Sequence, residues 1–288
     1  MRKKRNIVLI VLAMIMILSL PACGQGSGDV KTFVKKIKKV KSLEYETISY
    51  RRYLASNGED RILKGETHIR HGKIQLDPQM FSEYYMDSSS QSYDADGIDK
   101  KLLKLGSIDF LNRGCKVYSP KSKEVYVGTK LASRNSEWEW KKTKEIGSPE
   151  LGIKTSFLNV YEHYADKFKQ TEDDNYFYLD YKGDATKNLD QIGKMQRAII
   201  PESNLFTKGK KSIQSCKLEI HLVMRKGKGG PTPCETKIKI TTKLKDASSG
   251  ITVDNEDNFQ AFYRDINEVK EIKKPYGFDV SKVKKPSM

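Results

Sequence analysis

The chain has 288 residues, which is enough for one large domain with a substantial core or for two small ones. Its formal net charge is +16, which makes polyanions candidate binding partners. Lysine supplies most of this charge, whereas shaped phosphate pockets favour the forked guanidinium of arginine. The composition therefore argues against a specific phosphate-binding site.

The first residues, Arg2-Lys3-Lys4-Arg5, are basic, and an almost unbroken apolar stretch follows from Ile7 to Leu20. This stretch has 20 − 7 + 1 = 14 residues, fewer than the roughly 20 that a membrane-spanning helix needs. A basic start, a short apolar core and small residues at its end are typical of a secretory signal. An uncleaved membrane anchor is the alternative interpretation.

The segment Leu20-Pro21-Ala22-Cys23 resembles the lipobox of bacterial lipoproteins. The resemblance implies that the signal peptide 1–22 is removed and that the thiol of Cys23 receives a diacylglyceryl group. Two acyl chains hold a protein firmly at a bilayer, whereas one chain holds it only marginally. We therefore expect a lipid anchor on the outer face of the cell membrane, followed by a flexible tether over 23–29.

Removing the four basic leader residues lowers the formal charge from +16 to +12. An exported protein meets no nucleic acid, so anionic lipid headgroups and acidic wall polymers become the candidate neighbours. The alternative is that the lysines, which are spread along the chain, only solvate strand faces. Outside Cys23 the chain has Cys115, Cys216 and Cys234. A simple hairpin places the last two too far apart for a disulfide, so we expect no bridge between them.

Apolar residues at helical spacing predict a helix over 30–41, with Asp29 as its N-cap and lysines on its other face. The stripe consists of Val30, Phe33, Val34, Ile37 and Val40. This stripe is expected to pack on the strands that follow. A direct contact of this basic amphipathic helix with the membrane is the alternative.

Strands are expected next, beginning with a hairpin that turns at Asn57-Gly58 between "LEYETISYRRYL" and "RILKGETHIRHGKIQL". Further strands are expected in "FSEYYMD", "CKVYS", "EVYVG", "EWEWKK", "NYFYLDYKG", "KLEIHLVM" and "KIKITTKL". The last two alternate strictly between apolar and polar residues, which indicates an antiparallel sheet with one face exposed to solvent. Inserted helices are expected near 102–111, over 156–169 and after residue 189.

This order of elements predicts an α+β fold. We expect a large curved antiparallel sheet, an open half-barrel, with the N-terminal helix and a few inserted helices on its concave side. No proline- or glycine-rich linker divides the mature chain, so a single domain is expected over 30–275. A loose basic tail is expected over 276–288.

Residues with catalytic or metal-binding potential do not form a recognisable pattern. His68 and His71 are three positions apart, which places them on opposite sides of a strand. The serines have no G-x-S-x-G context, and no strand-to-helix phosphate loop is present. We therefore expect a protein that is not an enzyme and that uses no cofactor or metal.

Aromatic residues supply the one sharper hypothesis. The strand from Tyr176 to Tyr181 has no polar face, and two tryptophans share one face of theirs. Such strands are covered on both sides, or they line a cleft for an acyl chain or other apolar ligand. The candidate lining residues are Trp138, Trp140, Tyr176, Tyr178, Phe157, Tyr161 and Tyr164.

The layout resembles the uncharacterised Gram-positive lipoproteins related to the LolA/LppX-type half-barrels. The matching stretches are "FVKKIKKVKSLEYET", "EVYVG…WEWKK", "FYLDYKGD" and "INEVKEIKKP". The resemblance implies an open curved sheet with helices in its hollow, and carriage of lipids or lipoproteins in the better-known relatives. The first functional expectation is thus a non-enzymatic carrier of a hydrophobic ligand. The alternative is an envelope interaction or sensor module with a packed interior.

Overall fold

The computed structural model describes residues 26–57, 61–94, 114–130, 137–144, 146–200, 206, 213–245, 247 and 250–283. The leader 1–22, Cys23 and the helix expected near 102–111 lie outside these residues.

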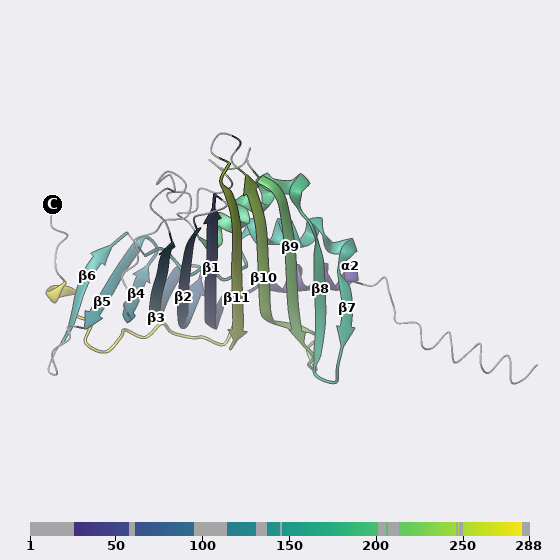
Figure 1. The fold of residues 1–288 in the computed structure, drawn as a ribbon. Coiled ribbons are helices and arrows are strands. Elements are labelled where there is room, and N and C mark those ends of the chain that lie inside the picture. Colours follow the sequence, from purple (N-terminus) through teal and green to yellow (C-terminus); the bar gives the residue numbers. More distant parts are fainter. Residues whose placement is uncertain are drawn as a thin grey trace, which may run out of the picture.

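Eleven antiparallel strands form one open, curved sheet, with helices on its concave side (Figure 1). The strand order across the sheet is β6-β5-β4-β3-β2-β1-β11-β10-β9-β8-β7. The strands are β1 (Ser42–Ser56), β2 (Arg61–Leu76), β3 (Gln79–Asp94), β4 (Gly114–Lys121), β5 (Glu124–Lys130), β6 (Trp138–Thr143), β7 (Lys169–Glu172), β8 (Tyr176–Asp184), β9 (Ile213–Arg225), β10 (Thr232–Lys245) and β11 (Thr252–Arg264). The expected fold class is confirmed.

Two of these strands, β7 and β11, were not expected from the sequence. β7 is a short edge strand without an apolar face. β11 lies in the middle of the sheet, between β1 and β10. Its buried positions include Asn255 and Asp257, which interrupt the apolar alternation that makes a strand recognisable.

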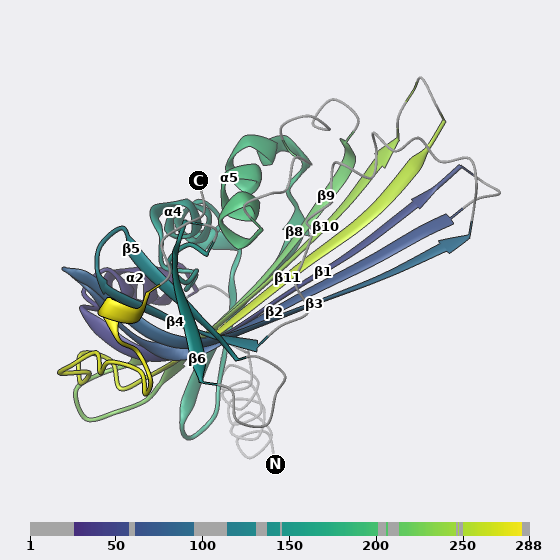
Figure 2. The same cartoon turned by 90° about the vertical axis from the view of Figure 1, so that its left-hand side faces the viewer.

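The longer helices are α2 (Gly26–Ile37), α4 (Thr155–His163) and α5 (Leu189–Ile199). Figure 2 shows all three on the same side of the sheet. The described residues also form short 3-10 helices, namely η1 (Ala165–Lys167), η2 (Thr186–Asn188) and η4 (Val280–Lys282). The helix expected over 156–169 is therefore divided, since α4 ends before Tyr164 and η1 leads directly into β7.

The expected N-terminal helix is present, but it begins earlier than its sequence pattern suggested. α2 starts at Gly26, so Asp29 lies in its first turn instead of capping it. Gly26 is buried, and a Cβ atom there would lie 2.3 Å from the carbonyl oxygen of Phe168. Close packing thus draws a glycine-rich stretch, expected to be part of a flexible tether, into the folded helix.

The segment 276–283, expected to belong to a loose tail, packs against the outer face of the sheet. The Phe278 ring lies 4.9 Å from the Tyr118 ring, 5.0 Å from the Tyr126 ring and 4.9 Å from the Trp140 ring. All three contacts are edge-to-face, the arrangement that aromatic pairs favour. Phe278 is therefore the main apolar contact of this segment, and Val283 packs against the same cluster.

We expect Phe278→Ala to destabilise the protein by about 2–3 kcal/mol, because it empties this aromatic cluster. Urea denaturation measures the change, and limited proteolysis should cut the variant faster within 270–283. Tyr276→Ala is the matched control, because Tyr276 is 88% exposed two positions away. Equal effects of the two substitutions would contradict the assigned role of Phe278.

Candidate functional site

The structure does not bring the seven candidate lining residues together. Phe157, Tyr161 and Tyr164 lie between α4 and the concave face of the sheet. Trp138 and Trp140 lie on the outer face of β6, where Phe278 covers Trp140. Tyr176 and Tyr178 of β8 lie on the outer face near the opposite edge of the sheet, which β7 forms.

Each of the three helix-side aromatic residues belongs to a packed contact. The Tyr161 ring lies 6.2 Å from that of Phe33, and the Phe157 ring lies 5.8 Å from that of Phe259. Tyr164 stacks on Tyr181 at 4.5 Å. All three side chains are almost completely buried. Side chains therefore fill the hollow under α2 and α4.

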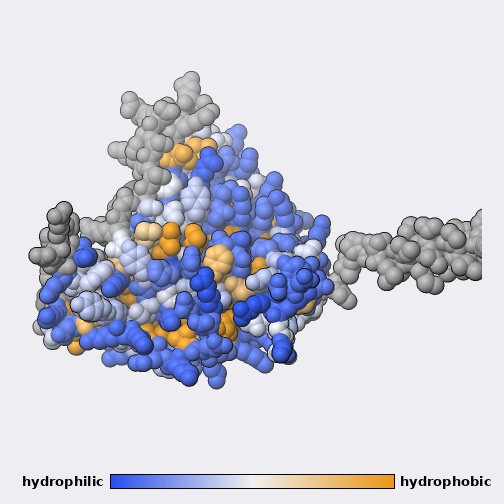
Figure 3. Space-filling model, turned by 90° about the horizontal axis from the view of Figure 1, so that it is seen from below, coloured by the Kyte–Doolittle hydropathy of each residue, from blue (hydrophilic) through white to orange (hydrophobic). Residues whose placement is uncertain are grey.

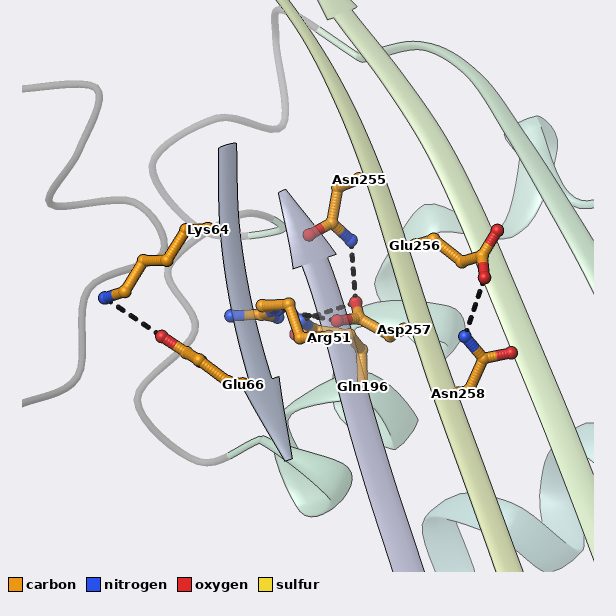
Figure 4. A network of polar contacts seen from close by, with 8 residues as sticks. All are labelled: Arg51, Lys64, Glu66, Gln196, Asn255, Glu256, Asp257 and Asn258. Atoms are coloured by element: carbon orange, nitrogen blue, oxygen red, sulfur yellow. Dashed lines mark hydrogen bonds and ion pairs between the residues drawn. The ribbon is translucent and has the colours of Figure 1, made fainter. Parts of the chain in front are cut away.

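Further along the concave face, charged side chains replace apolar ones. Arg51 of β1 meets Asp257 of β11 with 2.6 Å between Nε and Oδ1, and both side chains are buried (Figure 4). Asp257 also accepts hydrogen bonds from the side chains of Gln196, at 3.1 Å, and Asn255, at 2.8 Å. These donors compensate a carboxylate that has been removed from water.

The neighbouring strand β2 adds a second buried pair. Lys64 and Glu66 meet at 3.0 Å, and burial raises the pKa of Glu66. The same pattern continues into β3, where Glu83 lies 3.7 Å from Arg70 and accepts a hydrogen bond from Tyr45. Burial raises the pKa of Glu83 as well. This part of the concave face is therefore a polar wall that an acyl chain could not contact favourably.

A histidine lies within this row of charges. The Nδ1 atom of His68 is 2.9 Å from the hydroxyl of Tyr85. Burial lowers the pKa of His68 to about 4, and the positive charges of Arg70 and Arg51 add to the effect. The ring is therefore neutral at physiological pH.

Removing one member of the Arg51–Asp257 pair should be costly. We expect Asp257→Leu to lower the free energy of unfolding by about 3–5 kcal/mol, because Arg51 is left buried without its counterion. The double variant Arg51→Met/Asp257→Leu should recover most of this loss, since no unpaired charge remains. Urea denaturation of both variants measures the difference. If the double variant were as unstable as the single one, the pair would not be the source of the effect.

The depressed pKa of His68 predicts a pH dependence of stability. Only the unfolded chain takes up the His68 proton between pH 6.5 and 4, so this group's share of stability is lost as the pH falls through that window. We expect a loss of about 2 kcal/mol, less than the full shift because the ring retains some contact with water. The raised pKa values of Glu66 and Glu83 act in the opposite direction.

Comparison of the wild type with His68→Gln isolates the histidine contribution. Between pH 7 and pH 4.5 the unfolding free energy of the variant should fall less, or rise more, than that of the wild type, because the histidine contribution is removed and the glutamate contributions remain. Identical differences would show that His68 does not titrate as described.

The outer face of the sheet carries a groove of about 710 Å³ that crosses the strands from β7 to β1. Its polar lining residues are Tyr50, Lys167, Lys169, Asp180, Lys182, Glu219, His221, Lys237, Lys239, Asn258 and Gln260. Five of them are lysines and two are carboxylates. The groove therefore presents an excess of positive charge across several strands.

Tyr176 and Tyr178 line a second outer hollow of about 650 Å³, nearer the β9–β10 turn. Tyr178 donates a hydrogen bond to Asp173 at 2.6 Å. From below, hydrophobic side chains form separate small patches among hydrophilic ones (Figure 3). The surface seen in that view is thus polar with local apolar contacts.

The two histidines of β2, which could in principle bind a metal, are held apart. His68 faces Tyr85 while His71 contacts Tyr84, which confirms that the two histidines lie on opposite sides of β2. No group of three potential metal-binding side chains occurs among the described residues. None of the helices described here combines the length and the apolar composition of a membrane-spanning segment.

The register of β9 and β10 holds Cys216 and Cys234 apart, as expected. Cys216 pairs in register with Thr242, whereas Cys234 lies at the bulge beside Val223, and neither forms a disulfide. Burial raises the pKa of Cys115 and Cys216 to about 12, so both thiols stay protonated.

Sequence reasoning missed the buried charges. The available signal was the two-residue repeat of the strand, which places Arg51 on the same buried side of β1 as Ser49 and Tyr53. Asp257 likewise alternates with Asn255 and Phe259 on the buried side of β11. The outer groove had no comparable signal, since it is assembled from strands that lie far apart in the sequence.

No protein-family model and no curated protein matches this chain. Among solved structures, one of lipovitellin concerned with lipid–protein interactions is similar at 8% identity, covering 82% of this chain and 26% of its own, with a TM-score of 0.31. A DUF1329 family protein from Desulfovibrio piger is similar at 8% identity, covering 85% of this chain and 97% of its own, with a TM-score of 0.20. This chain thus spans about a quarter of the lipovitellin chain, and neither likeness carries an argument about function.

Proposed function

We propose that this chain is an extracytoplasmic lipoprotein, anchored through Cys23, that acts by binding and not by catalysis. Its outer sheet face is the binding surface for an envelope partner protein, and its interior is a scaffold. The resemblance to LolA/LppX-type half-barrels belongs to this proposal as a statement about architecture.

The state of the concave side carries the proposal. Phe33, Phe157, Tyr161 and Tyr164 fill the space under the helices. The adjoining part of the concave face carries the buried Arg51–Asp257 pair. Among the described residues, packed aromatic side chains occupy the first region, and the second has the wrong polarity for an acyl chain. Both observations favour an interaction module over a carrier of hydrophobic ligands.

The outer groove has the properties of a protein contact. It joins lysine side chains to the half-buried Ile48 and Tyr50, so it offers charge around a small apolar centre. Its lysine excess complements an acidic segment of a partner.

A photo-reactive amino acid at Tyr50 tests the groove in intact cells. We expect it to crosslink one envelope protein, because Tyr50 lies inside the groove. Lys237→Glu/Lys239→Glu should reduce the crosslinked product at least tenfold, since both lysines line the groove. Quantitative immunoblotting of the product measures the change.

Lys243→Glu/Lys245→Glu is the matched control, because these exposed residues of the same strand lie outside the groove lining. It should retain the crosslink. Absence of any crosslink from Tyr50, together with saturable displacement of a fluorescent fatty acid from the purified protein, would favour a hydrophobic-ligand carrier instead.

A further inference from the structure

The start of α2 limits how far the folded domain can move from its anchor. Only Gly24 and Gln25 lie between Cys23 and Gly26, the first residue of α2. Three residue steps span about 10 Å when fully extended. If Cys23 carries the lipid, as proposed above, the N-terminal end of α2 is held next to the membrane surface.

The apolar side of α2 is not available to the bilayer. Val30, Phe33, Val34 and Ile37 are at most 2% exposed. The Phe33 ring packs against Tyr161 of α4, and α2 also contacts η1 and β10. Insertion of this helix into lipid would require the core to open. The opposite, polar side of α2 is therefore the one presented outward.

That polar side is a row of lysines. Lys31, Lys35, Lys38 and Lys39 follow one another at i, i+4, i+7 and i+8, a spacing that keeps them on one side of the helix and of the turn after it. All four are exposed. Lys38 pairs with Glu162 at 3.0 Å, whereas the other three form no ion pair with the residues described here.

We propose that this lysine row binds the anionic phospholipid headgroups of the membrane that carries the anchor. The short connection brings the row to the bilayer, and its positive charge complements the negative surface. Lysine suits this role because a flexible point charge can follow mobile headgroups without a shaped pocket. Each lysine close to such a surface strengthens binding about fivefold at physiological salt.

Docking in this way also orients the domain. Figure 2 shows α2 on one side of the sheet, whereas the groove lies on the outer face. With the lysine row on the bilayer, the groove faces away from the membrane and stays open to a partner. The lipid contact therefore determines which surface of the sheet a partner can reach.

The first test uses the mature lipidated protein in vesicles of phosphatidylcholine alone or with 30% phosphatidylglycerol. Reaction with an acetylating reagent, followed by peptide mass spectrometry, measures the exposure of each lysine. We expect Lys31, Lys35 and Lys39 to react at least threefold more slowly in the anionic vesicles. Lys217, Lys243 and Lys245 on the outer face should react equally in both. Equal rates at the first three positions would overturn the proposal.

The second test separates the lysine row from the anchor. The chain from residue 24 onward keeps every described helix and strand but lacks Cys23. It should sediment with the anionic vesicles and not with the neutral ones, and 0.5 M salt should release it. Lys31→Glu/Lys35→Glu/Lys39→Glu should weaken binding at least tenfold. Lys217→Glu/Lys243→Glu/Lys245→Glu makes the same charge change on the other side of the sheet and should weaken it less than threefold.

Equal weakening by the two triple variants would show a general charge effect and would overturn the proposal. The mass of the N-terminal peptide from cells reports the anchor independently. An unmodified Cys23 combined with selective loss in the lysine-row variant would reject the anchor while supporting the lipid-binding row.

Discussion

The pairing of β1 with β11 is the constraint on which the rest of the architecture depends. It joins the first strand of the chain to the last, and it links the sequential series β1 to β6 with the series β7 to β11. The same pairing brings Arg51 against Asp257, 206 positions apart in the sequence. Without it the sheet would consist of two separate meanders. Such long-range pairing loses the conformational entropy of a large loop before the strand contacts stabilise the fold. We therefore expect this topology to fold slowly.

The concave face is divided between two kinds of packing. Where helices cover the sheet, aromatic and aliphatic side chains form a dry core around Phe157 and Tyr161. Along β1, β2, β3 and β11, some buried positions hold paired charges among apolar ones, and Arg51 and Asp257 are the most enclosed pair. Paired charges give little net stability but penalise alternative registers, because a one-residue slip would turn each of them to the wrong face.

Sequence patterns predicted the parts of the fold in which local periodicity and burial agree. Strict alternation identified β9 and β10, and the apolar stripe of α2 identified the first helix. The pattern did not predict β11, because the polar residues Asn255 and Asp257 occupy its buried positions. Their burial becomes understandable only once the partner strand β1 is known. Phe278 was assigned to a loose tail because its cluster comes from β4, β5 and β6, far away in the sequence. Local signals do not encode contacts of this range.

The same limit applies to function. The aromatic strands predicted one apolar cleft. In the structure, alternation along β6 and β8 places Trp140 and Tyr178 on the outer face, whereas Tyr161 lies in the core. Residue type alone could not reveal this separation, since it follows from strand register and from the placement of α4. The two surfaces proposed above for recognition, the outer groove and the lysine side of α2, lie on opposite sides of the sheet. The proposed membrane contact and the proposed partner site therefore lie on different sides of the sheet, and the packed side chains between the helices and the sheet separate them.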